Sequence, residues 1–304
     1  MSVELAVLDY HSNFLGFEPQ FATLENSSFV VVPVPLEKST TYGKGTAHGP
    51  GKIIEASRMI EFYDEKFDDE PCRRGIATLI PIPVKKKDVH KVIGQCAAIV
   101  CTLLEMGKFP ILLGGEHTIT IGGVQGVLNA GKNFSVVHLD AHSDLRDEYE
   151  NSKYNHACAM HRIWEMQPSV VLCGIRSQCA EEKEFIKTNR IPVYYAHDLK
   201  GRNSWEFIIN HLEQNVYLTI DCDFFDPSVV PAVGTPEPGG FFWEETLQFL
   251  QLLVSKRNIV GFDVVELSPQ AGLFYSEFTV AKLIYKLIGY IGRAQTERFQ
   301  VLNF

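Results

Sequence analysis

Short runs of apolar, often β-branched residues recur along the chain, and segments with helical periodicity lie between many of them. Each run has the length of a buried strand and is bounded by polar residues or glycine. The runs predict strands at residues 29–34, 109–113, 134–139, 169–172, 192–195, 216–220 and 258–265. Apolar residues that return every three or four positions predict helices at 88–106, 181–188, 205–212, 244–255 and 277–292.

The alternation of strands and helices predicts the fold class. Parallel strands need a crossover between them, usually a helix, so this alternation favours βαβ units and a mostly parallel sheet. The runs are apolar throughout, which indicates strands buried on both faces. We therefore predict an α/β protein with three layers, α/β/α, around a mostly parallel central sheet. No internal repeat and no long Ser-, Gly- or Pro-rich linker divides the sequence, so the expectation is one domain over residues 1–304.

Composition narrows the class of protein. With 45% hydrophobic residues in 304, the chain can bury a sizeable core. The net charge is −9 and the basic residues are scattered, apart from a lysine triplet at 85–87 that we interpret as a solvated loop, so nucleic acid is not an expected partner. No apolar run approaches ~18 residues and no signal-like N-terminus is present, so neither membrane insertion nor export is expected. The seven cysteines show no CxxC spacing, which favours free thiols and a cytoplasmic location.

Four of the predicted strands are followed directly by residues that carry chemistry. In an open parallel sheet, ligands bind beyond the carboxyl ends of the strands, and these ends meet at one edge. Four segments therefore share that edge: GGEHTIT at 114–120, DAHSD at 140–144, DCDFFDP at 221–227 and ELSP at 266–269.

The spacing of the acidic residues points to a metal centre. Side chains at positions i and i+2 of a strand point the same way, which pairs Asp140 with His142 and Asp221 with Asp223, and Asp144 joins them from the following turn. A single aspartate at a strand end often caps a helix, and a single buried histidine is usually a core residue. Together, four carboxylates and two imidazoles in one low-dielectric crevice cost roughly several kcal/mol unless cations neutralise them. Two divalent ions balance four aspartates, so we predict a binuclear centre.

The types of ligand also bear on the metal and on the reaction. Carboxylate and imidazole without thiolate favour two Mn²⁺ ions and disfavour a structural zinc site, with other divalent metals as alternatives. Cys222 lies between two candidate ligands but should point to the opposite face of the chain. Paired divalent metals lower the pKa of water towards neutrality, so hydrolysis is the predicted chemistry.

These segments resemble the metal-binding signatures of the ureohydrolase family, which includes arginase, agmatinase and formimidoylglutamase. Three signatures occur in the order that the family has, and the resemblance covers nearly the whole chain after about residue 30. It implies an arginase-like fold and a homo-oligomer, either a trimer or a hexamer. Further segments that resemble the family are TAHGPGKIIEAS at 46–57, KYNHACAMHRI at 153–163, CGIRS at 173–177, VGTPEPGG at 233–240 and VVELSP at 264–269.

The resemblance implies two sets of metal ligands. One metal would have one imidazole and three carboxylates as ligands: His117, Asp140, Asp144 and Asp221. The other would have a similar set: Asp140, His142, Asp221 and Asp223. Asp140 and Asp221 would then bridge the two metals. Glu116 stands where the family more often has Asp. We expect it to contact the residues around the metal ligands without binding a metal itself.

The resemblance also implies catalytic roles. Glu266 would bind the planar guanidinium through paired N–H bonds, although a strand-end salt bridge is the alternative. Asp144 would pass a proton from the nucleophile to the leaving nitrogen. His156 resembles a mobile histidine that shuttles protons at the mouth of the site, and Ala157 stands where the family more often has Gly.

The resemblance also implies a small cationic guanidino compound as the substrate. Cys179 stands where arginases carry an acidic residue, which leaves the α-ammonium of arginine without a charge partner. The segments at 153–160 and 233–240 resemble prokaryotic agmatinases most, so the first expectation is hydrolysis of agmatine to putrescine and urea, a step of polyamine biosynthesis. The alternatives are aminopropylagmatine, guanidinobutyrate, arginine and formimidoylglutamate. A metal-dependent deacylase needs only one metal, and a non-catalytic binding protein would be expected to have lost ligands, so both are less favoured.

Overall fold

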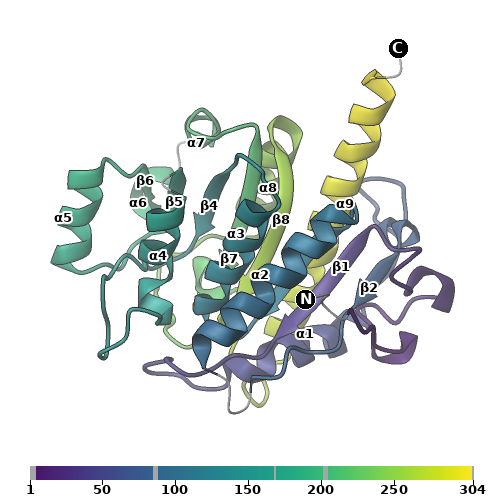
Figure 1. Ribbon diagram of the computed structural model, residues 1–304, viewed down its shortest axis with the longest axis horizontal. Helices are drawn as coiled ribbons and strands as arrows, with labels where there is room; N and C mark the ends of the chain where they lie inside the picture. The colour runs from purple at the N-terminus through teal and green to yellow at the C-terminus, as the bar shows by residue number, and fades with distance from the viewer. Residues whose placement is uncertain (1–4, 85–87, 168, 201–204, 303–304) are drawn as a thin grey trace.

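The computed structural model describes residues 5–84, 88–167, 169–200 and 205–302. Within these ranges eight strands form one sheet, and every pair of neighbouring strands is parallel (Figure 1). Helices cover both faces of this sheet, which confirms the predicted α/β class with three layers. The lysine triplet at 85–87 lies outside the described residues.

The strands are β1 (Phe29–Val34), β2 (Ile76–Thr78), β3 (Phe109–Gly114), β4 (Ser135–Leu139), β5 (Val170–Ile175), β6 (Val193–Tyr195), β7 (Asn215–Asp221) and β8 (Asn258–Val265). All of the predicted strands are present, and the short β2 is an addition at the edge. Their order in the sheet is β2-β1-β3-β8-β7-β4-β5-β6. The four strands that precede the candidate chemistry, β3, β8, β7 and β4, are therefore neighbours in the middle of the sheet.

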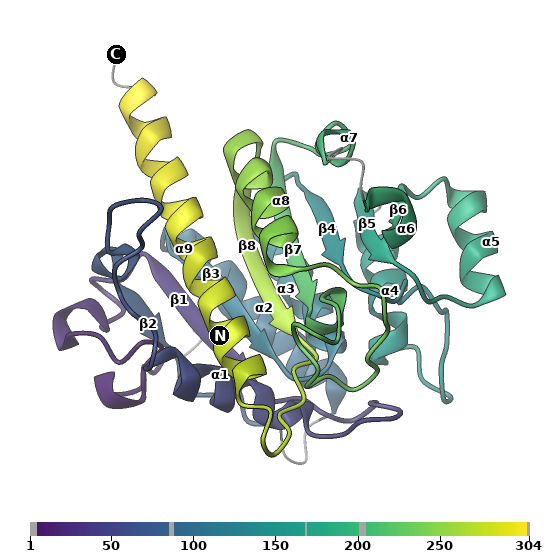
Figure 2. The same ribbon diagram turned by 180° about the vertical axis from the view of Figure 1, so that it is seen from behind.

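The helices are α1 (Gly49–Ser57), α2 (Val89–Glu105), α3 (Thr120–Asn129), α4 (Ala159–Met166), α5 (Ala180–Asn189), α6 (Ala196–Leu199), α7 (Glu206–Ile209), α8 (Trp243–Lys256) and α9 (Tyr275–Leu302). Figure 1 shows α2, α3 and α4 in front of the sheet, and Figure 2 shows α1, α8 and α9 in front of its other face. No helix within the described residues combines the length and the apolar character needed to span a membrane.

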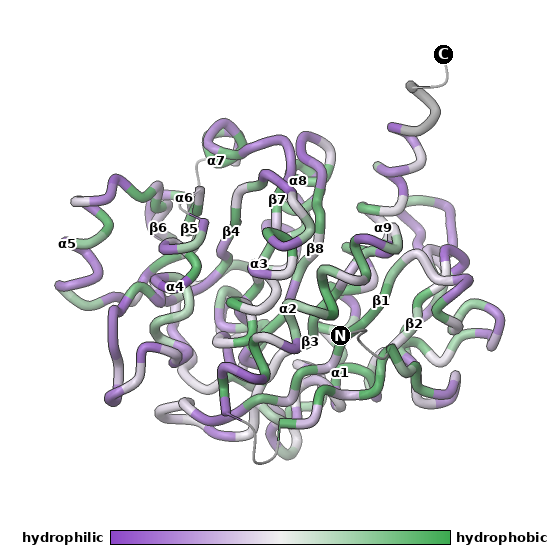
Figure 3. Tube along the Cα trace, in the orientation of Figure 1, coloured by the Kyte–Doolittle hydropathy of each residue, from purple (hydrophilic) through white to green (hydrophobic). Residues whose placement is uncertain are grey.

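Alternation along the strands explains the two apolar layers. In β1 the side chains of Phe29 and Val31 belong to the core on the side of α1, α8 and α9, whereas Val30, Val32 and Val34 belong to the core on the side of α2 and α3. Each of these residues is fully buried. Figure 3 shows hydrophobic residues concentrated along the strands and the inner sides of the helices. A strand buried on both faces has no polar alternation, which is the pattern that the sequence shows.

Two predicted helices have different limits in the structure. The helix predicted at 205–212 ends at Ile209, because His211 and Leu212 donate to carbonyls three residues back, in tighter turns. The helix predicted at 277–292 starts two residues earlier and continues to Leu302, and its last turns extend past the sheet (Figure 1). Helices α1, α3, α4 and α6 were not predicted.

A buried ion pair ties α9 to the segment after α1, and we expect its loss to destabilise the protein. Lys286 Nζ lies 3.0 Å from Asp64 Oδ2, and both residues are buried. Replacing Lys286 by methionine leaves the carboxylate of Asp64 without its counter-charge, so the free energy of unfolding should fall by about 3–5 kcal/mol. Denaturant unfolding monitored by fluorescence measures this change.

The exposed ion pair of Lys52 with Glu55 provides the matched control. Lys52→Met should leave the free energy of unfolding unchanged, because exposed pairs contribute little. Removing both charges of the buried pair, with Asp64→Leu and Lys286→Met together, should restore most of the lost stability. Equal effects of Lys286→Met and Lys52→Met would contradict the assignment of a buried, coupled pair.

Candidate metal centre

The turn after β3 brings His117 to the middle of the sheet edge. A Cβ atom on Gly115 would lie 2.0 Å from the carbonyl oxygen of Leu36, so only glycine fits at this crossing of two segments. The N–H of Glu116 donates to the same carbonyl, at 2.8 Å. This close approach starts the short helix η5 (His117–Ile119) directly above the end of β3.

The hydrogen bonds of His117 determine which of its ring nitrogens faces the site. Its Nε2 lies 2.9 Å from Oγ1 of Thr219, and that hydroxyl donates its single hydrogen to Oδ1 of Asp263, at 2.6 Å. The Thr219 oxygen therefore accepts from His117, which places the hydrogen of a neutral imidazole on Nε2. Its Nδ1 then presents a lone pair.

That lone pair points at carboxylates. Nδ1 of His117 is buried and has no hydrogen-bond partner, although three carboxylate oxygens lie 3.2 Å from it. A lone pair facing three negative oxygens is unfavourable unless a cation lies among them. The residues present therefore fit a metal ion. The three oxygens are Oδ2 of Asp140, Asp144 and Asp221.

A second group of the same kind adjoins the first. Nδ1 of His142 lies 2.9 Å from Oδ2 of Asp223 and 3.6 Å from Oδ1 of Asp140. Asp140 thus turns one oxygen to each histidine, which is the arrangement that a bridging ligand requires. Backbone N–H groups orient the carboxylates: Ala141 donates to Asp223 at 3.1 Å, and Asp223 donates to Asp221 at 2.8 Å.

The electrostatics of this cluster favour cations. Burial raises the pKa of Asp221 well above its usual value, and the charges of Asp223 and Asp140 raise it further. Burial and Asp140 also raise the pKa of Asp223. Burial alone would lower the pKa of His117, but the surrounding carboxylates, Asp140 first, raise it well above the usual value. Protonating both histidines would leave two of the four carboxylate charges unbalanced, whereas two divalent ions would balance all four with the histidines neutral.

His138 supports the centre in a way that the sequence did not reveal. It is buried and hydrogen-bonded, and its partner is the central carboxylate: Nε2 lies 2.7 Å from Oδ2 of Asp140. Residues 138, 140 and 142 alternate along the end of β4, so the same i, i+2 spacing that paired Asp140 with His142 also indicates His138. A histidine bound to a ligand carboxylate fixes the orientation of that ligand.

Arg176, in the CGIRS segment, holds the ligand-bearing loops together. Its guanidinium donates to the carbonyl oxygens of Asp223 at 2.5 Å, of Glu237 at 2.9 Å and of Gly174 at 3.2 Å. These contacts join the end of β5 to the short helix η7 (Cys222–Phe224). The planar fork of an arginine can satisfy several carbonyls at once, so a single side chain fixes the backbone that carries Asp223.

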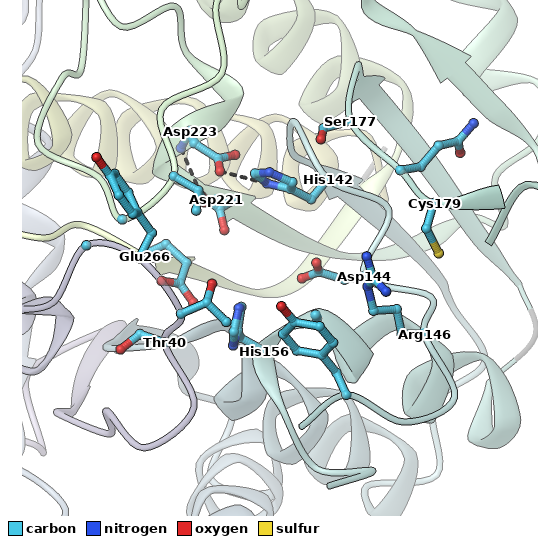
Figure 4. A pocket seen from close by; sticks show the side chains of 18 of the residues that line it. Thr40, His142, Asp144, Arg146, His156, Ser177, Cys179, Asp221, Asp223 and Glu266 are labelled. Atoms are coloured by element: carbon cyan, nitrogen blue, oxygen red, sulfur yellow. Dashed lines mark hydrogen bonds and ion pairs between the residues drawn. The ribbon is translucent and has the colours of Figure 1, made fainter. Parts of the chain in front are cut away.

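The candidate residues line one cavity of about 230 Å³ (Figure 4). His117 and Asp140 are almost fully buried at its base, each in contact with the other. Arg146 and Cys179 lie on the side of the cavity away from Asp221 and Asp223 (Figure 4), and Tyr149 also lines the cavity. The predicted site residues that line the cavity are His142, Asp144, His156, Asp221, Asp223 and Glu266.

Two of these residues have strained backbones. Asp144 has a φ of 53° and Glu266 a φ of 63°, in the left-handed region that residues other than glycine seldom adopt. Such a conformation costs about 1–3 kcal/mol and persists only where neighbouring contacts hold it. The carbonyl of Asp144 accepts from the N–H of Met160, and the N–H of Glu266 donates to the carbonyl of Gly115. This strain at both positions supports a functional role.

Other residues considered from the sequence lie outside the cluster. Asp226 accepts hydrogen bonds from Ser228 and Gly239, so it stabilises a loop. Cys222 lies in the apolar core and does not line the cavity. His48 is exposed and does not line the cavity.

A parallel sheet with a buried cluster of histidines and aspartates at the ends of its central strands is typical of α/β enzymes that bind metal ions. The model of the arginase family matches residues 27–289, and the chain belongs to this family. It is therefore a ureohydrolase, an enzyme that acts on linear amidines.

Several members of this family are similar to the chain over most of its length. It is 41% identical over 283 residues to the N(1)-aminopropylagmatine ureohydrolase of Synechocystis sp., an alignment that covers 90% of this chain and 92% of that protein. It is 36% identical over 270 residues to the protein of the same name from Thermococcus kodakarensis, covering 87% and 91%. The crystal structure of the agmatine ureohydrolase of Thermoplasma volcanium superposes with a TM-score of 0.83 at 30% identity, over 97% of both chains.

Proposed function

We propose that this enzyme hydrolyses the guanidino C–N bond of N(1)-aminopropylagmatine, releasing urea and the corresponding polyamine. The observation that carries this choice is the similarity to two ureohydrolases of that name, at 41% and 36% identity. Agmatine, the first expectation from the sequence, is the second candidate, because the superposed enzyme of Thermoplasma volcanium acts on it.

Two divalent metal ions, for which we propose Mn²⁺, would supply the charge that makes water a nucleophile at neutral pH. The residues that would hold them are those whose donor atoms converge in the structure: His117, Asp140, His142, Asp144, Asp221 and Asp223.

The remaining site residues would act on the substrate and its protons. Glu266 lines the cavity beside Asp221, and one of its oxygens accepts from the N–H of His117 at 2.6 Å, which fixes the carboxylate. It would bind the guanidinium as a charge-assisted fork. Asp144 would carry a proton to the leaving nitrogen, and His156 would exchange protons with solvent at the mouth.

The side of the cavity that carries Arg146 and Cys179 favours a substrate that has no α-amino and α-carboxyl groups at its end. Glu182 lines this wall, but both of its oxygens already accept backbone bonds, from Leu145 at 2.9 Å and from Cys179 at 2.7 Å. The carboxylate of Glu182 is thus engaged with the backbone of the loop, and Cys179 offers no charge to the α-ammonium of arginine. Arg146 is a cation on the same wall, so a substrate that ends in a carboxylate, such as guanidinobutyrate, is the rival to test.

Urea release from a panel of compounds tests this proposal. The protein is stripped of metal with a chelator, reloaded with Mn²⁺ and assayed for urea with aminopropylagmatine, agmatine, guanidinobutyrate and arginine, and for formamide with formimidoylglutamate. We expect kcat/KM for aminopropylagmatine to exceed that for agmatine by about tenfold or more, a difference of roughly 1.4 kcal/mol. Preference for guanidinobutyrate would assign Arg146 as the recognition residue and overturn the polyamine substrate.

Two variants distinguish urea release at the metal centre from urea release by a contaminating enzyme. Asp223→Ala should abolish Mn²⁺-dependent urea release, since it removes a carboxylate that lies 2.9 Å from His142. Asp198→Ala, an exposed aspartate in α6, should leave the activity unchanged. No urea from any member of the panel would refute the proposed function.

A further inference from the structure

Ser39 lies between Glu116 and His156, and it contacts both through its hydroxyl. Its Oγ lies 2.8 Å from Oε1 of Glu116 and 3.2 Å from Nδ1 of His156. The backbone N–H of His156 also donates to the same oxygen, at 3.0 Å. Glu116 is fully buried and His156 lines the cavity, so the serine connects a buried charge to the proposed proton shuttle.

The count of hydrogens gives each contact a direction. A serine hydroxyl has one hydrogen and two acceptor lone pairs. The carboxylate of Glu116 can only accept, so the hydrogen of Ser39 goes to it and both contacts from His156 are donations. The hydrogen of neutral His156 is then on Nδ1, and Nε2 is left with a lone pair that can accept a proton.

We propose that Ser39 is a positioning residue for the proton transfer: with Glu116 behind it, it holds His156 as the Nδ1–H tautomer with Nε2 free to take up and release protons. This inference rests on the proposed function, in which His156 exchanges protons between the site and solvent. A histidine without this partner would divide its hydrogen between its two nitrogens, and only one of the two forms has Nε2 available.

The role of the hydroxyl can be separated from the role of the loop. Oε2 of Glu116 accepts the backbone N–H groups of Lys38 and Ser39, at 2.5 Å and 2.7 Å, and Oε1 also accepts the hydroxyl of Thr118 at 2.7 Å. These bonds do not use the Ser39 side chain, so Ser39→Ala leaves the loop anchored and removes only the contacts that the hydroxyl makes with Glu116 and His156.

A double-mutant cycle on the Mn²⁺-loaded enzyme tests the link. We expect Ser39→Ala to lower kcat by about tenfold with KM and metal content unchanged, and to have less than about a twofold effect in a His156→Ala background. Ser39→Thr, which keeps the hydroxyl, should recover most of kcat. Ser255→Ala, an exposed serine bonded only to the carbonyl of Leu252, should have no effect. An undiminished kcat in Ser39→Ala, or additive losses in the double variant, would overturn the proposal.

The tautomer is measured independently of activity. In ¹⁵N-histidine-labelled protein loaded with diamagnetic Zn²⁺, two-bond ¹⁵N–¹H correlations show which ring nitrogen carries hydrogen, and the resonance lost in His156→Ala identifies the residue. We expect Nδ1–H in the wild type and a shift towards Nε2–H in Ser39→Ala. Nε2–H in the wild type would overturn the proposal. If no guanidino compound yields urea, the proposed function fails, and this spectrum alone decides the tautomer.

Discussion

Replacing Asp140 by asparagine is expected to lower the rate of urea release by more than about 10³-fold. Loss of a residue that only hydrogen-bonds to a metal ligand already costs about 10–100-fold in activity, and loss of a ligand should cost more. Asp140 turns Oδ2 to His117 and Oδ1 to His142, so it is the carboxylate shared by both groups of the cluster. An amide lacks the charge to serve two cations. Metal analysis after gel filtration should show fewer than two Mn²⁺ per chain.

A graded comparison distinguishes a lost ligand from general disruption of the cluster. His138→Leu removes the bond from His138 to Asp140 and keeps all predicted ligands. Its activity should fall by about 10–100-fold, between the wild type and Asp140→Asn. Full activity with two metals bound in Asp140→Asn would show that the cluster is not the catalytic centre.

The second large effect is expected at Glu266, where Glu266→Gln should lower kcat/KM by about 10²–10³-fold. Glutamine has nearly the same shape, but it cannot accept two charge-assisted N–H bonds from a guanidinium, which together are worth roughly 3–4 kcal/mol. Steady-state kinetics with each guanidino substrate measures the change, and the metal content should stay at two.

The exposed Glu244, in the first turn of α8, provides the control for Glu266. Glu244→Gln should leave kcat/KM unchanged. If Glu266→Gln lost metal instead of substrate affinity, Glu266 would belong to the metal centre and not to the guanidinium clamp. An unaltered kcat/KM would favour the salt-bridge alternative weighed from the sequence.

Much of the candidate centre could be predicted because it follows local rules. Four of the apolar runs end where a polar motif begins, and the i, i+2 spacing of Asp140 with His142 places two donors on one side of the chain. The buried strands could be predicted for the same reason, since unbroken apolar runs indicate burial on both faces.

Helix α3 shows where local rules fail. Its sequence TIGGVQGVLN contains three glycines, each of which disfavours a helix by about 1 kcal/mol relative to alanine. In the structure a Cβ on Gly122 would lie 2.6 Å from Cβ of Cys96, and one on Gly126 would lie 2.5 Å from Cβ of Val100. The glycines let α3 approach α2 closely, and this packing outweighs the local preference.

The support around the ligands could not be predicted either. Ser39, Glu116 and His156 come from three distant parts of the chain, and nothing in their own neighbourhoods indicates that they touch. The contacts of Arg176 with the loop of Asp223 have the same character. Contacts between such distant segments depend on the order of the strands in the sheet, and the periodicity of a sequence does not predict this order.

The position of β8 has a consequence for how the protein is made. The last strand of the chain lies between β3 and β7, so it alone joins β2-β1-β3 to β7-β4-β5-β6. Until residues 258–265 leave the ribosome, β3 and β7 both have unpaired edges, and the piece that carries His117 has no sheet contact with the piece that carries Asp140 and Asp221. The candidate ligands therefore come together only once β8 has been made, and a chain truncated before β8 would lack the strand that joins the two parts of the sheet.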